Sequence, residues 1–345
     1  MLAALITGKG EVTLREFPDP HPQPGAVTVA ISYCGICGTD IHAYQSGRPY
    51  RPSICGHEWT GTVTEAGVGV TSVGEGDRVV VSVAPACGIC RPCVTGDPSH
   101  CMTAFLSAIG GDPLAPPHGG FASAIAVAQE RVMKAHPGLT DLQLGQLEPT
   151  TVTLHAVRRS GLREGQLVVV QGAGPIGLTT FQWAKALGAG HVIVVEPSPE
   201  RAELARSLGA DSVVGPGEEA RTRINELAQG LNGADLVYEC VGSGPAVQWA
   251  ADLVRRGGEL CLVGVADGEA TIVPAGWIAK EISVSTSIAY ERHDFTDAMD
   301  MLADGRVQTD ALHTKTASLA EFESVLADLA TGRSVEIKVL VDPRI

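Results

Sequence analysis

LVVVQGAGPIGLTTFQWAKALGAGHVIVVE, residues 167 to 196, is the stretch from which the fold of the whole chain can be inferred. An apolar run leads into three closely spaced glycines, Gly172, Gly174 and Gly177, and a helical segment follows them. A second apolar run then ends on the carboxylate of Glu196. The order of strand, glycine turn, helix and strand predicts a dinucleotide-binding unit.

Each part of this unit has a physical task in binding a dinucleotide. The glycines allow a tight turn, close approach of a pyrophosphate and close packing of helix on strand. The helix that begins at Pro175 and Ile176 presents free N–H groups to the phosphates. Glu196 follows Gly177 by roughly 20 residues, where a carboxylate accepts from an adenosine ribose hydroxyl and repels a 2′-phosphate. We therefore expect NAD, although Arg201 is close enough in sequence to pair with a phosphate.

Length and charge restrict the class of protein. A chain of 345 residues is long enough for about two domains. A net charge of −14 argues against nucleic acid and anionic membranes as partners. The first residues do not resemble a signal peptide, and no apolar run is long enough to span a bilayer, so we expect a soluble cytoplasmic protein.

The pattern of the chain changes once in its middle and again near its end. Residues 1–151 are expected to form a mainly β domain, residues 152–290 a doubly wound parallel sheet, and residues 291–345 a return to the first domain. Strands are expected at Val27–Ser32, Gly61–Thr64, Arg78–Val83 and Glu336–Val341, and near Leu167, Val192, Ser212, Leu236, Leu260 and Ile282; helices are expected at Phe295–Ala303 and Leu319–Leu329.

Four of the nine cysteines are packed into the segment CGICRPCVTGDPSHC. Cys87, Cys90 and Cys93 are separated by two residues each, and Cys101 follows after seven more. Four thiolates this close can complete a tetrahedral shell around one zinc ion and leave no position for a substrate. We interpret the segment as a structural zinc site. Buried cysteines, a disulfide and an iron–sulfur cluster are the alternatives.

A second set of ligand types is spread along the chain, as catalytic metal sites tend to be. Cys37 lies in CGICGTDIH, His57 and Glu58 lie in CGHEWTG, and Glu148 lies in QLEPTTVTLHAV. A thiolate, an imidazole and carboxylates can hold zinc and leave one position open. Singly, each residue has an ordinary structural interpretation, and only the combination indicates a metal. Cys34 and Cys37 also form a CxxC, but the βα context of a redox dithiol is absent.

These motifs occur in a familiar order. CGICGTDIH, GHEWTGTV, the four-cysteine segment, LEPTTVTLHAV and GAGPIG together resemble the zinc-dependent medium-chain alcohol and polyol dehydrogenases over essentially the full length. The resemblance implies a GroES-like catalytic domain beside a Rossmann domain, and reversible oxidation of a primary or secondary alcohol by NAD. Glu148 replaces a cysteine of the alcohol dehydrogenase branch, so the chain looks closer to the sorbitol, butanediol and threonine dehydrogenases.

The resemblance also assigns roles to residues of this chain. A catalytic zinc would be held by Cys37 and His57, with Glu58 and Glu148 supplying or alternating in the remaining position. Asp40 would orient His57. Thr39 and His42 match the positions of a proton relay from the alcohol to solvent. The positions that would contact the cofactor beyond the glycine turn are Arg201, Val265, Ser287, Ile288 and Ala289.

Two departures from the family pattern bear on specificity. Gly38 stands where alcohol dehydrogenases often carry a His or Arg near the pyrophosphate, which says little about the chemistry. Ala289 stands where sorbitol dehydrogenases carry an Arg in the pocket, which argues against a sorbitol-like substrate. The pocket itself has six candidate lining residues, Tyr44, Arg48, Tyr50, Trp59, Phe105 and Trp277, each of which could equally be a core or surface residue.

Two other functions remain as alternatives. A zinc-free enone or quinone reductase of the same fold would lack the zinc-ligand types that this chain carries. A non-catalytic nucleotide-binding protein would retain the fold without turnover. The resemblance further implies a homodimer or homotetramer acting on a small alcohol or carbonyl compound.

Overall fold

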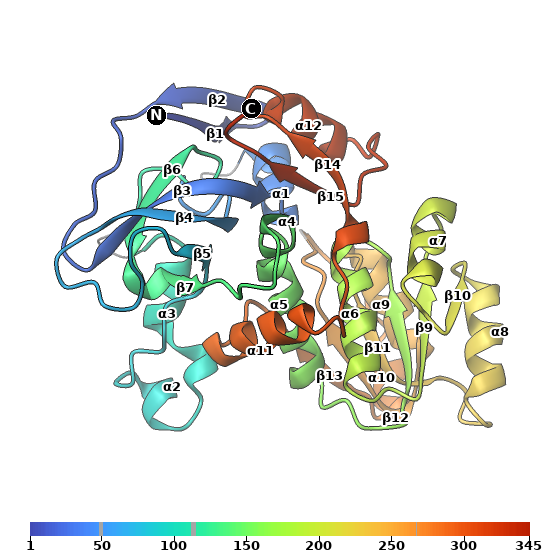
Figure 1. Cartoon of the computed structure of the whole chain (residues 1–345). Coiled ribbons are helices and arrows are strands. Elements are labelled where there is room, and N and C mark those ends of the chain that lie inside the picture. The colour runs from blue at the N-terminus through green and yellow to red at the C-terminus, as the bar shows by residue number, and fades with distance from the viewer. Residues whose placement is uncertain (48–50, 112–114, 267) are drawn as a thin grey trace. The chain divides into compact units, whose positions relative to one another are not determined.

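The computed structural model describes residues 1–47, 51–111, 115–266 and 268–345 (Figure 1). They form two compact units. Unit 1 comprises Met1–Pro149, Tyr290–Ala303 and Leu312–Ile345, and unit 2 comprises Thr150–Ala289 and Asp304–Ala311. No helix in these described ranges has the length and apolar character that crossing a membrane requires.

Unit 1 is built around two sheets and several short helices. Its strands are β1 (Leu2–Gly8), β2 (Glu11–Glu16), β3 (Ala26–Gly35), β4 (Glu58–Ala66), β5 (Arg78–Val81), β6 (Ala124–Ala128), β7 (Val132–Lys134), β14 (His313–Ala317) and β15 (Lys338–Val341). Its helices are α1 (Gly38–Ser46), α2 (Arg91–Val94), α3 (Met102–Ala108), α4 (Asp141–Leu144), α11 (Arg292–Ala303) and α12 (Phe322–Ala330), with 3-10 turns at Pro98–His100 and Gln129–Arg131. A further 3-10 turn spans Asp310–Leu312.

The larger sheet of unit 1 has seven strands in the order β14-β15-β3-β4-β5-β7, with β6 also paired to β3. The expected strands of residues 1–151 are confirmed, as are the two C-terminal helices and the last strand. Strand β14 was not expected from the sequence. Because β15 pairs with β14 on one side and with Cys34 and Gly35 of β3 on the other, the C-terminal segment reaches the middle of the sheet.

The core of unit 1 lies beneath this sheet and under α12. Alternate residues of β3, such as Val27, Val29 and Ile31, are almost completely buried. The rings of Phe121 and Phe322 pack against each other with their centroids 4.2 Å apart. This core fixes the ends of β3 and β4, from which the candidate metal ligands extend.

Unit 2 has a six-stranded sheet with alternating helices, as expected. Its strands are β8 (Leu167–Gln171), β9 (His191–Val195), β10 (Ser212–Val214), β11 (Ala234–Glu239), β12 (Val254–Leu262) and β13 (Ser283–Thr286). Its helices are α5 (Leu147–Arg159, which begins in unit 1), α6 (Pro175–Ala186), α7 (Pro199–Ser207), α8 (Glu218–Leu227), α9 (Gly244–Leu253) and α10 (Pro274–Lys280).

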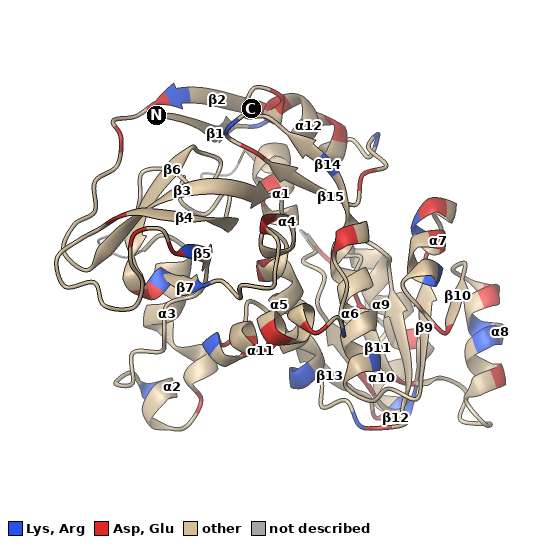
Figure 2. Ribbon diagram, viewed as in Figure 1, with Lys and Arg blue, Asp and Glu red and all other residues tan. Residues whose placement is uncertain are grey.

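All pairings in this sheet are parallel, in the order β10-β9-β8-β11-β12-β13. Every residue of β8 is buried, as expected for a parallel strand covered on both faces. Figure 2 shows charged residues on helices α7 and α8, whereas β8 and β9 carry no Lys, Arg, Asp or Glu. The strand order reverses between β8 and β11, and ligands of such sheets bind beyond the carboxyl ends of the strands at this point.

Candidate metal and cofactor sites

Three of the predicted catalytic ligands come together in unit 1. Cys37 follows β3 and caps the N-terminus of α1, while His57 directly precedes β4 and Glu58 is the first residue of β4. Because Gly35 of β3 pairs with Glu58 of β4, the two segments meet at one end of the sheet. One ligand atom from each of Cys37, His57 and Glu58 lies within 4.8 Å of the other two.

The imidazole of His57 is oriented for metal binding by a backbone group. Its Nδ1 lies 2.8 Å from the carbonyl oxygen of Ile54, so Nδ1 carries the proton and Nε2 keeps its lone pair. Asp40, which the family resemblance expects to orient this ring, is not the acceptor of its Nδ1–H. Asp40 instead accepts from the backbone N–H groups of Cys37, at 2.8 Å, and Gly56, at 3.0 Å. It ties together the two segments that carry the ligands.

The site has an excess of negative groups. Burial disfavours the imidazolium, yet the Cys37 thiol and the carboxylates of Glu148 and Asp40 raise the pKa of His57 well above its ordinary value. Glu148 lies half-buried in the first turn of α5. Burial, together with Glu58, raises the pKa of Glu148 to about 7, against the lowering effect of His57. A donor set that attracts positive charge in this way fits a divalent cation.

Glu58 has a partner that was not anticipated from the sequence. The ammonium group of Lys338, on β15, forms an ion pair with Oε2 of Glu58 and donates to the carbonyl oxygen of Ile36 at 2.9 Å. Both side chains are almost completely buried, at 1% exposed for Glu58 and 4% for Lys338. The signal in the sequence is a lysine at the start of an otherwise apolar strand, KVLV, but nothing local identifies its partner.

The four-cysteine segment forms a compact cluster, as predicted. The Sγ atoms of Cys87, Cys90, Cys93 and Cys101 lie within 4.8 Å of one another. Three backbone N–H groups donate to these sulfurs, from Cys87 and Ala104 to Cys101 and from Cys90 to Cys87. Backbone and side-chain donors lower the pKa of Cys87 to about 6, as thiolate ligands of a metal require.

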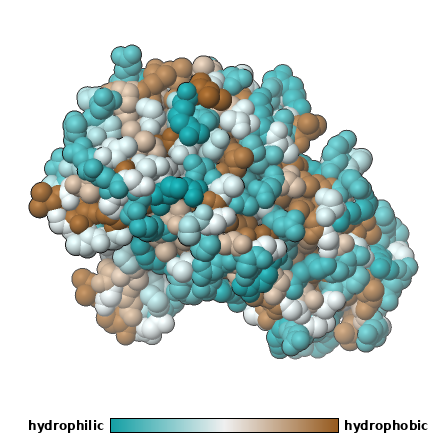
Figure 3. Space-filling model, in the orientation of Figure 1, coloured by the Kyte–Doolittle hydropathy of each residue, from teal (hydrophilic) through white to brown (hydrophobic). Residues whose placement is uncertain are grey.

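The lobe around this cluster has almost no core of its own. Ile89 is 84% exposed, Val94 is 67% exposed and Met102 is 54% exposed. Figure 3 shows apolar residues at the surface in the part of unit 1 where Figure 1 places α2. Since so little apolar surface is buried here, a metal held by the four thiols would add stability that packing does not supply.

Thr39 and His42 lie one turn apart on α1, immediately after Cys37. The thiol of Cys37 lies 3.7 Å from Oγ1 of Thr39. Both side chains are only partly buried. The helix therefore places a hydroxyl beside the candidate ligand and an imidazole one turn further on.

The glycine turn in unit 2 has the predicted conformation. Gly172 has a φ of +96°, which favours glycine. A Cβ atom on Gly177 would lie 1.9 Å from the carbonyl oxygen of Gly172, so no side chain fits there. Gly174 is the N-cap of α6, and Pro175 and Ile176 form its first turn. The turn and the helix N-terminus are thus arranged for a pyrophosphate.

Glu196 directly follows β9 and is 8% exposed. Its carboxylate accepts from the backbone N–H of Ala173, at 2.7 Å, and from that of Ser198, at 2.9 Å. A carboxylate has about four lone-pair sites, so it can still accept from a ribose hydroxyl. Arg201 lies in the first turn of α7, two residues after its first residue.

The remaining cofactor candidates follow β12 and β13. Val265 is 61% exposed and Ile288 is 73% exposed. The hydroxyl oxygen of Ser287 is buried without a hydrogen-bond partner among the described residues. Ala289 adopts a φ of +54°, which is unusual for a residue with a Cβ. An unsatisfied hydroxyl and exposed apolar side chains at the carboxyl ends of strands fit a cofactor surface.

The aromatic pocket candidates do not form one group. Tyr44 and Trp59 belong to the buried core of unit 1, and Trp277 packs partly buried on the core of unit 2. Phe105 is 44% exposed on the four-cysteine lobe. Arg48 and Tyr50 lie outside the described residues.

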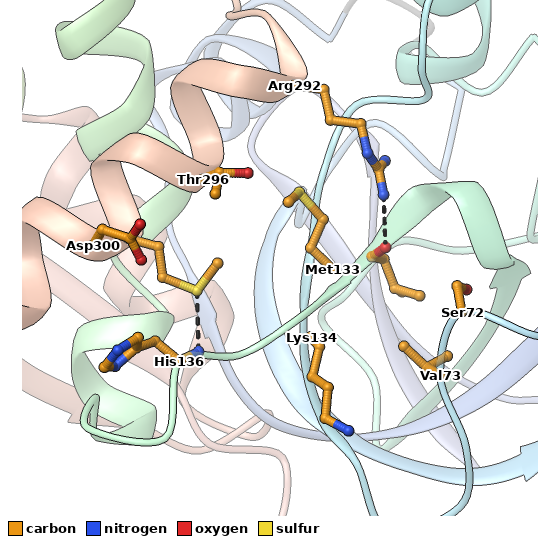
Figure 4. A pocket seen from close by; sticks show the side chains of 10 residues that line it. Ser72, Val73, Met133, Lys134, His136, Arg292, Thr296 and Asp300 are labelled. Carbon is orange, nitrogen blue, oxygen red and sulfur yellow. Dashed lines mark hydrogen bonds between the residues drawn. The ribbon is translucent and has the colours of Figure 1, made fainter.

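Figure 4 shows a cavity of unit 1 that is about 350 Å³ in volume. Met299 accepts from the backbone N–H of His136 at its edge, and Arg292 donates to backbone carbonyls, including that of Val132. None of the predicted catalytic ligands lines this cavity, whose walls are Ser72, Val73, Val132, Met133, Lys134, His136, Arg292, Thr296, Met299 and Asp300.

Comparison with known proteins places this arrangement in a family. Residues 23–137 match the family described as alcohol dehydrogenase GroES-like domain, and residues 175–304 match zinc-binding dehydrogenase. The chain is 33% identical to sorbitol dehydrogenase of Halalkalibacterium halodurans, over 97% of each chain. Among solved structures, 2R,3R-butanediol dehydrogenase of Bacillus subtilis is 30% identical, with a TM-score of 0.84 and 99% of each chain covered. A zinc-binding dehydrogenase of Sinorhizobium meliloti bound to NADP is 29% identical, with a TM-score of 0.85 and the same coverage.

Proposed function

We propose that this chain is an NAD-dependent dehydrogenase of polyols or diols. It belongs to the zinc-dependent medium-chain alcohol and polyol dehydrogenases, which exchange a hydride between an alcohol and NAD(P). We further propose one catalytic and one structural zinc ion per chain. The observation that carries the proposal is the convergence of Cys37, His57 and Glu58 beside Thr39. The predicted resemblance to this family is confirmed.

The proposed division of labour follows the two units. Unit 1 is the catalytic unit and unit 2 the cofactor-binding unit, and both sets of zinc ligands come from unit 1. The structural zinc is held by the four cysteines. The catalytic zinc is held by Cys37, His57 and a carboxylate, and when bound it supplies the positive charge that lowers the pKa of an alcohol hydroxyl. Since Lys338 engages one oxygen of Glu58, Glu148 is the carboxylate better placed to change between ligand and free states.

The protein's own groups move the proton in this proposal. Oγ1 of Thr39 receives the hydroxyl proton of the alcohol and passes its own proton toward His42, which exchanges with solvent because its ring is partly exposed. Asp40 takes no proton. Its bonds to the N–H groups of Cys37 and Gly56 keep the segment before α1 in place during turnover.

NAD is proposed over NADP because Glu196 is buried and fixed by two backbone donors. A 2′-phosphate at hydrogen-bonding distance from this carboxylate would be repelled by several kcal/mol at an effective dielectric near 20, a preference of about a thousandfold. The NADP-bound relative makes the comparison of the two cofactors a necessary test. Equal kcat/KM with NAD and NADP would remove this part of the proposal.

The substrate class rests on the relatives and on Ala289. Sorbitol dehydrogenase and butanediol dehydrogenase act on polyhydroxy compounds of different lengths, as their names state. Ala289 cannot supply the guanidinium that sorbitol dehydrogenases place in the pocket, so we propose a shorter or less polar diol. Reduction of NAD with a panel of polyols, vicinal diols, amino alcohols and aromatic alcohols tests this. Zinc analysis, with about two ions per chain expected, separates the protein from a zinc-free reductase.

The proposal also covers the oligomeric state and the cellular location of the protein. We propose a homodimer or homotetramer in the cytoplasm. Strand β13 ends the sheet of unit 2, and Val284 on β13 and Ile278 on the preceding helix are 43% and 75% exposed, as on an edge that another chain covers. All nine cysteines are free thiols, which suits a reducing compartment. Light scattering of the wild type and of Val284→Lys tests the association.

A further inference from the structure

A second buried carboxylate, besides Glu196, lies at the carboxyl ends of the strands of unit 2, and no role in the proposed reaction has been given to it. Glu239 is the last residue of β11 and is completely buried. Its neighbours in register are Gln171 of β8 and Leu262 of β12. An acidic side chain inside a parallel sheet needs a strong reason, since burying a carboxylate without partners is costly.

Four backbone N–H groups converge on this residue, two on its carboxylate and two on its main-chain carbonyl oxygen. Oε1 of Glu239 accepts from Val241 at 2.7 Å and from Gly242 at 2.9 Å. The backbone carbonyl of Glu239 accepts from Val263 at 3.0 Å and from Gly264 at 2.8 Å. The first pair belongs to the turn after β11 and the second pair to the turn after β12. The carboxylate of Glu239 therefore fastens the turn after β11, whereas its main-chain carbonyl, which any residue would supply, fastens the turn after β12.

The two turns touch each other through glycines. A Cβ atom on Gly264 would lie 2.4 Å from the backbone nitrogen of Gly242 and 3.0 Å from Oε2 of Glu239. A Cβ atom on Gly242, whose φ is +71°, would lie 2.8 Å from the carbonyl oxygen of Val265. The contact is thus close enough that a single methyl group would separate the turns.

The same turns present apolar side chains at the switch in strand order. Val241 is 52% exposed and Val265 is 61% exposed. Cγ2 of Val241 lies 3.1 Å from the position that a Cβ would take on Gly172, the first glycine of the pyrophosphate turn. A dinucleotide that lies on the glycine turn and continues past the switch point must pass Val241 and then Val265.

We infer that Glu239 is a positioning residue for the dinucleotide, because its carboxylate fixes the turn that carries Val241, and this turn lies against Gly172 on one side and against the turn that carries Val265 on the other. The inference rests on the proposed binding of NAD. Glu239 touches neither substrate nor metal ligand in this account. Burial raises the pKa of Glu239 against the lowering effect of the two N–H donors, and Oε2 has no partner among the described residues, so the side chain holds the turn after β11 through Oε1 alone.

Two substitutions at Glu239 and one on the neighbouring strand separate positioning from general stability. Glu239→Leu keeps the volume and removes the acceptor, whereas Glu239→Gln keeps a carbonyl oxygen for both N–H groups. Glu259→Leu is the matched control, because Glu259 lies on β12 and accepts from the hydroxyl of Ser285, away from the turns. With the zinc-loaded enzyme, we expect the NADH dissociation constant to rise at least tenfold for Glu239→Leu, less than threefold for Glu239→Gln and less than twofold for Glu259→Leu.

A second variant tests the same inference in case Glu239→Leu does not fold. Gly264→Ala leaves Glu239 intact and pushes the turns apart through the Cβ that would meet Gly242. It should also weaken NADH at least tenfold and raise the KM for NAD more than it lowers kcat. If Glu239→Leu and Gly264→Ala both bind NADH within twofold of wild type, the inference is overturned.

Amide hydrogen exchange without cofactor tests the same role independently of NAD. The peptide covering residues 240–242 should exchange faster in Glu239→Leu than in wild type and return to the wild-type rate in Glu239→Gln. Residues 263–266, whose N–H groups bond the main-chain carbonyl of residue 239, should change less, and residues 167–171 of β8 should not change. Unchanged exchange in residues 240–242 would refute the inference even if NADH binding were altered. A wild-type protein that binds no NADH would refute the proposed function, while the exchange data would still decide the role of Glu239.

Discussion

Lys338→Met is the substitution whose effect can be worked out most fully from the structure. It removes the cation that the described part of the chain pairs with Glu58, whose side chain is 1% exposed. It also removes the donor to the carbonyl oxygen of Ile36. Methionine has nearly the same length as lysine without its charge, so the main change is an uncompensated buried carboxylate. Breaking a buried pair by removing one partner costs about 3–5 kcal/mol.

This free energy should appear as a shift in melting temperature. Unit 1 contains roughly 200 residues, and in a domain of that size about 1 kcal/mol corresponds to roughly 2–4 °C. We therefore expect the calorimetric transition of unit 1 to fall by about 6–20 °C at neutral pH. The matched control is Lys134→Met, since the pair of Lys134 with Asp77 has a lysine that is 65% exposed. Its loss should cost less than about 1 kcal/mol.

The contribution of Lys338 to stability should depend on pH in a direction that follows from its pKa. Burial alone would lower the pKa of Lys338, but Glu58 and Cys37 raise it above its ordinary value. A raised pKa means that the stabilisation is complete below the unfolded pKa of about 10.4 and is lost as the pH rises through the higher folded value. The difference between wild type and Lys338→Met should thus be constant near neutrality and shrink in strong alkali.

A double substitution distinguishes the pair from ordinary packing. Glu58→Gln combined with Lys338→Met removes the buried charge as well as its partner, so much of the lost stability should return. The reasoning is refuted if Lys338→Met melts within about 3 °C of wild type, or if the double variant is no more stable than Lys338→Met alone.

Three further outcomes follow from the site. Cys93→Ala should lose one zinc ion per chain and make the four-cysteine lobe sensitive to protease, because a structural zinc contributes on the order of 10 kcal/mol to the segment it closes; unchanged zinc content and melting would contradict the assignment. His57→Ala should abolish turnover while NADH binding, a property of unit 2, is retained, and residual alcohol oxidation near the wild-type rate would count against the catalytic site. Thr39→Ala should lower kcat about a hundredfold, and Thr39→Ser should lower it much less. His42→Gln should slow oxidation mainly at lower pH, and added imidazole should restore part of the rate. Wild-type turnover in Thr39→Ala, measured where hydride transfer limits the rate, would exclude the relay.

Features that depend on neighbouring residues could be predicted from the sequence. The strand, turn, helix and strand of residues 167–196 are confirmed, because glycine spacing and apolar runs determine them locally. The clustering of Cys87 with Cys101 follows from a short loop. The meeting of Cys37 with His57 was expected from the family resemblance, and the pairing of β3 with β4 brings them together.

Features that depend on backbone atoms or distant segments could not be predicted. The partner of His57 is a carbonyl oxygen, which every residue has, so no side chain signals it. Asp40 lies next to the ligands as expected, but it binds backbone N–H groups. Lys338 is separated from Glu58 by 280 positions and meets it only because β15 inserts beside β3. The role of Glu239 depends on where two turns touch.

Lys338 also explains how the catalytic group tolerates so much negative charge. Asp40 and Glu58 are buried, Glu148 is half-buried, and Cys37 adds a thiolate when it binds metal. A divalent cation alone would leave these four groups with an excess charge of about −2, and Lys338 reduces it to about −1. Because the ammonium group is held by Ile36 and Glu58 on the side of β3 and β15, it neutralises the carboxylate while it remains bonded to protein atoms. The lysine of the last strand therefore belongs to the proposed catalytic site together with the ligands that the motifs predict.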